Sequence, residues 1–143
     1  MEHLGRALEA VPGDSTLPSL QLAAGMLDYL GMKRLYAVDI AEYFRRAGPK
    51  PGSKETWLYL ELETSFQDHG HAADLMDSIT SLKQDYEQAW KQEWTNYRMG
   101  SALGRWDAEY EYWRSFQARI QDYTGRHKEG ETLPPLESFR PKR

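Results

Sequence analysis

The segment from Glu93 to Tyr123 constrains the fold more than any other part of the chain, because it gathers many aromatic side chains. Its bulky residues recur every three or four positions, so they lie along one face of an α-helix. Such a face is stable only when other helices cover it, and we expect the rest of the chain to supply them. The predicted face comprises Leu103, Trp106, Tyr110, Trp113, Gln117 and Ile120, with Phe116 and Tyr123 beside it.

A second helical pattern runs from Asp14 to Ala47 and carries two apolar faces. Gly48 and Pro49 follow it directly and predict its end. A helix that is apolar on two faces normally lies between neighbours, so we expect this one to be covered on both. One face consists of Leu20, Ala24, Leu27, Leu35 and Val38, and the other of Leu22, Tyr29, Tyr36 and Tyr43.

The remaining patterns predict a second long helix over Ala72–Trp94 and a third over Ser101–Tyr123, with Gly125 as the C-cap of the third. The segment Lys54–Phe66 alternates like a strand, but a lone strand has nothing to pair with, so we predict a short helix. The predicted fold class is therefore all-α: an antiparallel bundle of three long helices with an extra short helix.

Length and composition indicate one globular domain of 143 residues. We expect a lead-in over residues 1–14, the bundle domain over residues 15–125 and an extended or mobile tail over residues 126–143. The net charge of -4 argues against nucleic acid as a partner. No apolar run approaches the roughly 20 residues of a membrane span, and no signal peptide opens the chain. We therefore expect a soluble protein of the cytoplasm rather than a secreted or membrane-bound one.

Acidic residues on the third helix are the first candidates for chemistry. Asp107, Glu109 and Glu111 lie close together, and paired carboxylates can hydrolyse glycosides. A solvated helix edge with ion pairs to Arg105 and Arg114 explains the same residues more simply, and we favour that interpretation.

Two histidines, His69 and His71, are the first candidates for metal binding. The carboxylate–histidine motif of di-iron bundles is missing from every predicted helix, and a loop before a helix accounts for both histidines. The chain has no glycine-rich phosphate loop and no nucleophile motif. We therefore expect no catalytic residue, no metal ion and no cofactor.

Aromatic and arginine side chains near the break between the second and third long helices are candidates for a binding surface. Aromatic side chains offer flat contact area at low entropic cost. The candidate binding or interface residues are Trp94, Tyr97, Arg98, Arg105 and Tyr112.

Two segments, Leu20–Asp39 and Trp90–Trp113, resemble the C-terminal helical region that follows the catalytic barrel in some bacterial family 20 glycoside hydrolases, the β-N-acetylhexosaminidase group. In that region a helix ending in a Trp-rich patch is followed by a glycine turn and an arginine-bearing aromatic helix. The resemblance covers most of residues 15–123, with Pro49–Phe66 as an insertion. That family catalyses with an adjacent Asp-Glu pair, and this chain contains no Asp-Glu dipeptide, so no catalytic residue carries over.

The resemblance implies a non-catalytic accessory domain, cut from a larger enzyme, that packs on the catalytic barrel or mediates a homodimer. The alternative is a free-standing helical module that binds a protein or a small ligand. A third possibility is a small enzyme with a carboxylate site on the bundle.

Overall fold

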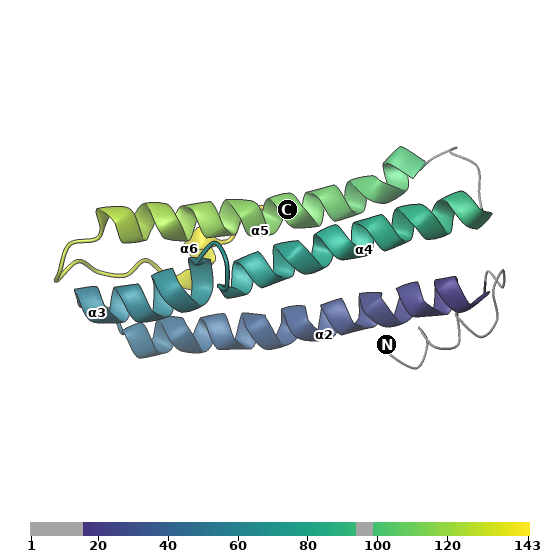
Figure 1. The fold of residues 1–143 in the computed structure, drawn as a ribbon. Coiled ribbons are helices and arrows are strands. Elements are labelled where there is room, and N and C mark those ends of the chain that lie inside the picture. Colours follow the sequence, from purple (N-terminus) through teal and green to yellow (C-terminus); the bar gives the residue numbers. More distant parts are fainter. Residues whose placement is uncertain (1–15, 94–98) are drawn as a thin grey trace.

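The computed structural model describes residues 16–93 and 99–143. Within these residues the chain forms helices and no strands, which confirms the predicted all-α class. The bundle consists of α2 (Thr16–Ala47), α4 (His71–Glu93) and α5 (Met99–Arg126). α4 runs antiparallel to α2 and to α5 and packs against both (Figure 1).

The short helix before α4 is present, as predicted, but most of it is a π-helix. One turn, α3 (Ser53–Glu55), continues directly into η1 (Thr56–Ser65). The Thr64 hydroxyl donates to the Tyr59 carbonyl at 2.7 Å, and the Ser65 hydroxyl donates to the Leu60 carbonyl at 2.9 Å. Both bonds reach back five residues, which matches the wider turn of a π-helix.

Glycines shape the connections between the helices. Gly48 has a φ of 81°, the left-handed conformation that ends α2 as predicted. Gly70, directly before α4, lies against the preceding turn: a Cβ there would be 2.6 Å from the Phe66 nitrogen. Gly125 does not cap the third helix as predicted, because α5 continues through it to Arg126.

The aromatic helix buries a face that is turned slightly from the predicted one. Tyr110 was expected in the core but is 36% exposed. The buried positions advance by three, four and three residues, so they follow a line that passes beside Tyr110. They are Trp113, Phe116, Ile120 and Tyr123.

Only one of the two apolar faces predicted for α2 is covered. Tyr29 belongs to the face that also carries Leu22, Tyr36 and Tyr43, and it is buried in the core. On the other face Leu27, Leu35 and Val38 are 69%, 66% and 63% exposed, and Leu20 is also exposed. The expectation that neighbours cover both faces is therefore wrong within the described residues, and we call this exposed row (Leu20, Leu27, Leu35 and Val38) the outer face of α2.

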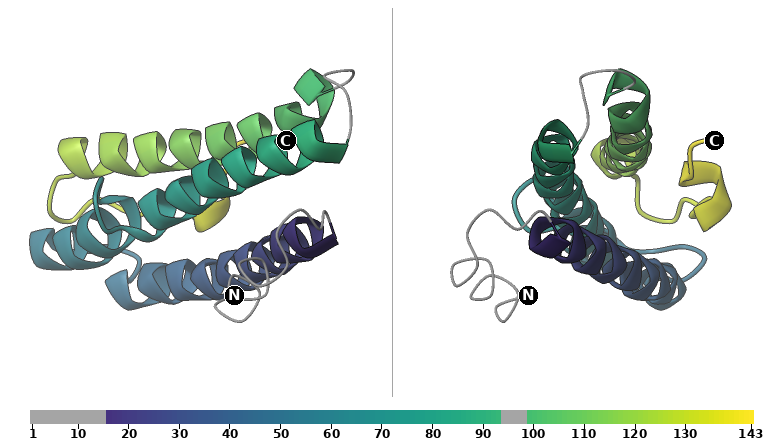
Figure 2. Two further views of the ribbon diagram at one scale, coloured as in Figure 1. Left: turned by 45° about the vertical axis from the view of Figure 1, so that its right-hand side comes forward. Right: turned by 90° about the vertical axis from the view of Figure 1, so that its right-hand side faces the viewer.

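The C-terminal residues differ from the expected extended or mobile tail. They include a short helix, α6 (Leu136–Phe139), whose Leu136 and Phe139 are buried in the core. The centre of the Phe139 ring lies 5.5 Å from the ring centre of Phe44 on α2 and 5.6 Å from the ring centre of Tyr123 on α5. Figure 2 shows α6 beside α5, on the side away from α4. The Leu133 nitrogen also donates a hydrogen bond to the Pro49 carbonyl at 2.8 Å, so the C-terminal segment packs on the bundle.

Candidate functional site

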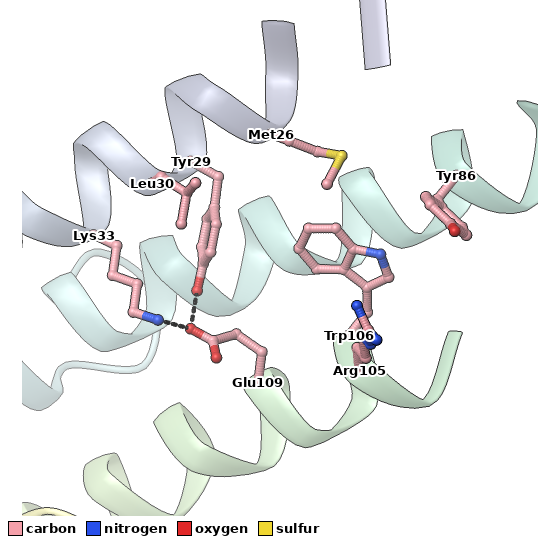
Figure 3. Close-up of a pocket in the computed structure, with 8 residues that line it drawn as sticks. All are labelled: Met26, Tyr29, Leu30, Lys33, Tyr86, Arg105, Trp106 and Glu109. Carbon is pink, nitrogen blue, oxygen red and sulfur yellow. Dashed lines mark hydrogen bonds and ion pairs between the residues drawn. The ribbon is translucent and has the colours of Figure 1, made fainter. Parts of the chain in front are cut away.

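The three long helices border a cleft of about 290 Å³. Its walls combine aromatic, aliphatic and charged side chains that converge from all three helices (Figure 3). The cleft is lined by Met26, Tyr29, Leu30 and Lys33 from α2, Tyr86 from α4, and Arg105, Trp106 and Glu109 from α5.

Glu109 forms the polar centre of this cleft, and only 12% of its side chain is exposed. Its Oε1 accepts hydrogen bonds from the Tyr29 hydroxyl at 2.7 Å and from Lys33 Nζ at 2.5 Å. Its Oε2 accepts from the Arg143 guanidinium at 3.2 Å. Burial alone would raise the pKa of Glu109, but the bonds from Lys33 and Tyr29 and the charges of Lys33 and Arg143 hold it below its ordinary value. Glu109 is thus an anion with two counter-cations.

Tyr29 connects this polar centre to the core. Its hydroxyl accepts a hydrogen bond from Trp113 Nε1 at 3.2 Å. The centres of the Tyr29 and Trp106 rings lie 6.2 Å apart in an edge-to-face arrangement. Burial is the largest cause that raises the pKa of the Tyr29 hydroxyl, and the hydrogen bond to Glu109 raises it further. The hydroxyl therefore stays protonated at neutral pH and keeps donating to Glu109.

A wider groove of about 690 Å³ adjoins the cleft between α5 and the C-terminal residues. It shares Arg105 and Glu109 with the cleft. On its wall the Arg143 guanidinium lies 4.5 Å from the centre of the Tyr112 ring, a cation–π contact. Arg143 therefore links Tyr112 to Glu109.

Two of the five predicted binding residues lie at these hollows. Arg105 lines both the cleft and the groove, and Tyr112 lines the groove. Trp94, Tyr97 and Arg98 lie outside the described residues.

The predicted solvated acidic edge of α5 is only partly correct. Glu111 pairs with Arg114 at 3.0 Å on the surface, as expected. Glu109 instead turns inward and pairs with Lys33 and Arg143 rather than with Arg105. The sequence offered no signal for this site, because Lys33 and Glu109 come from helices far apart in the chain.

The histidine at the start of α4 makes contacts that join α4 to α2. His71 Nε2 lies 3.1 Å from Asp39 Oδ2, and the centres of the His71 and Tyr36 rings lie 4.1 Å apart. No group of three metal-ligating side chains occurs in the part of the chain that the structure describes. The contacts of His71 are thus contacts between helices.

Among the described helices, none is long and apolar enough to cross a membrane. No protein-family model, curated protein or solved structure matches the chain. The relation to family 20 glycoside hydrolases therefore stays a prediction from sequence resemblance.

Proposed function

We propose that this chain is a non-catalytic helical domain that packs on the catalytic barrel of a β-N-acetylhexosaminidase-like glycoside hydrolase. The observation that carries the proposal is the outer face of α2, where four large apolar side chains are at least half exposed. Apolar residues gathered on one face of a soluble domain are typical of a surface that binds another protein.

The shape of this face suits an opposing helix. Ala24 and Gly31 lie between the large side chains along the same row, and a Cβ at Gly31 would have no heavy atom within 4 Å. The row therefore alternates ridges with shallow gaps, into which the side-chain ridges of another helix can pack. A (β/α)₈ barrel presents a ring of helices on its outside, so it offers partners of this kind.

The carboxylates support a role other than hydrolysis. A glycosidase acid must hold its proton near neutral pH, which requires a raised pKa. The pKa of Glu109 is instead lowered by its cationic partners, and Glu111 is an exposed carboxylate paired with Arg114. Glu109 therefore lacks the raised pKa of a general acid, and the Asp-Glu pair of the resembled family is missing from the chain.

The proposal can be tested by mixing the chain with a family 20 catalytic barrel from the same genome and measuring co-elution by size-exclusion chromatography. The test variant carries Leu27→Glu and Leu35→Glu, which places two charges on the outer face of α2. The control carries Gln84→Glu and Gln88→Glu, which adds the same charge at exposed positions on α4.

We expect the wild type and the α4 control to co-elute with the barrel and the α2 variant to elute alone with unchanged helical content. Absence of a complex, or a complex that survives the α2 substitutions, contradicts the proposal. A homodimer of the chain that the α2 substitutions dissociate also contradicts it, because the outer face would then bind a second copy.

A further inference from the structure

The cleft beside Glu109 is separate from the outer face of α2, and its chemistry indicates a small-molecule ligand. Its volume of about 290 Å³ is close to the lower limit of ordinary ligand pockets, roughly 300–1,000 Å³. The lining joins a mostly apolar wall to a few convergent charged groups, which is the usual composition of such pockets. A ligand of one or two fused rings matches this size.

The charges around the cleft favour an anion. Glu109 is the acidic group of the lining, and Lys33 and Arg143 already pair with it. Arg105 also lines the cleft, and no ion pair involves it within the described residues. The nearby acidic residues are occupied elsewhere, since Glu111 pairs with Arg114 and Asp107 with Lys83. A cationic ligand would thus meet a carboxylate that is already neutralised, whereas an anion meets a guanidinium.

The walls of the cleft favour a flat aromatic body. Trp106 extends from α5 toward Met26 on α2, and Tyr29 lies beside its indole (Figure 3). Tyr86 on α4 and Leu30 on α2 complete the apolar lining. An aromatic ring gains stacking and burial here beyond what an aliphatic chain of equal size obtains.

We propose that this cleft binds a small aromatic carboxylate, with Arg105 pairing with the carboxylate and Trp106 packing against the ring. Arg105 is well suited to this role, because a guanidinium binds a carboxylate through two parallel hydrogen bonds. Lys33 and Arg143 hold Glu109 and keep its charge from repelling the ligand.

Three matched probes test the charge requirement by isothermal titration calorimetry on the full chain: 2-naphthoate, 2-naphthylmethanol and 2-naphthylmethylammonium. We expect saturable binding of 2-naphthoate, about tenfold tighter than of either other probe. Equal binding of the three probes, or no saturable binding of 2-naphthoate below roughly 10 mM, overturns the proposal.

Two variants and one spectrum locate the binding. Arg105→Gln should weaken 2-naphthoate binding about tenfold. Arg114→Gln, an exposed α5 arginine outside the cleft lining, should leave it unchanged. In an NMR titration the indole N–H signal of Trp106 should shift and that of the exposed Trp57 should not. Unchanged affinity in Arg105→Gln, or an equal shift of Trp57, shows that the probe binds elsewhere and refutes the assignment.

Discussion

The Tyr29 hydroxyl donates a 2.7 Å hydrogen bond to Glu109 Oε1 and so connects α2 to α5 across 80 residues of sequence. The same hydroxyl accepts the indole N–H of the buried Trp113. One oxygen therefore joins the aromatic core to the charged cleft.

Replacing Tyr29 by Phe should lower the free energy of unfolding by about 1–3 kcal/mol, because the buried Trp113 N–H loses its acceptor. Urea denaturation at neutral pH measures the change. Tyr110→Phe is the control, since Tyr110 lies on the exposed side of α5 and should change stability by less than about 0.5 kcal/mol. Equal effects of the two substitutions would mean that the buried hydroxyl network adds nothing.

Glu109 should make stability depend on pH in the acid range. Its folded-state pKa is lowered below the ordinary 4.5, so its contribution is present above pH 4.5 and is lost as the pH falls through the folded-state value. The Glu109→Gln variant should be less stable than the wild type at neutral pH, and the difference should shrink in acid. Urea denaturation across this pH range measures both, and a constant difference at every pH contradicts the ion-pair assignment.

Two glycines should respond oppositely to alanine. At Gly70 a Cβ meets the Phe66 backbone at 2.6 Å, so Gly70→Ala should cost about 1–3 kcal/mol. At Gly104, inside α5, a Cβ would have no heavy atom within 4 Å. Gly104→Ala should therefore raise the free energy of unfolding by about 1 kcal/mol, because alanine has a higher helix propensity than glycine. Thermal unfolding of both variants measures the pair, and a neutral Gly70→Ala would refute the close packing before α4.

The anchoring of the C-terminal residues can be tested at α6. Phe139 is 5% exposed and packs against Phe44 and Tyr123, so Phe139→Ala should cost about 3–5 kcal/mol. Leu27→Ala on the outer face of α2 is the control and should cost less than about 0.5 kcal/mol. Denaturation midpoints that match for the two variants would show that α6 does not stabilise the bundle.

Much of the fold was accessible from sequence because its signals are local. Gly48 ends α2 through its own backbone conformation, and the apolar spacing of residues 72–94 predicts the helix that the structure shows as α4. The π-helix was not predicted, since i→i+5 bonding leaves no distinct mark on a short apolar pattern. The exposure of Leu27 and Leu35 was also missed, because amphipathicity shows that a face is apolar but not whether the chain itself covers it.

The cleft could not be predicted from the sequence for a related reason. Lys33 and Glu109 meet only because α2 and α5 lie at a particular rotation and height in the bundle. A rotation of α5 that exposes Tyr110 also turns Glu109 inward, and no sequence periodicity fixes that rotation to within one residue. Arg143 reaches Glu109 through the fold of the C-terminal residues, which α6 anchors.

Methyl NMR of the chain mixed with a family 20 catalytic barrel tests the central claim, docking through the outer face of α2, most directly. We predict that the methyl signals of Leu20, Leu27, Leu35 and Val38 shift or broaden on addition of the barrel. The buried Leu60 and Leu75 serve as internal controls and should keep their positions. Unchanged signals from the outer face, whether or not signals elsewhere respond, would contradict the account.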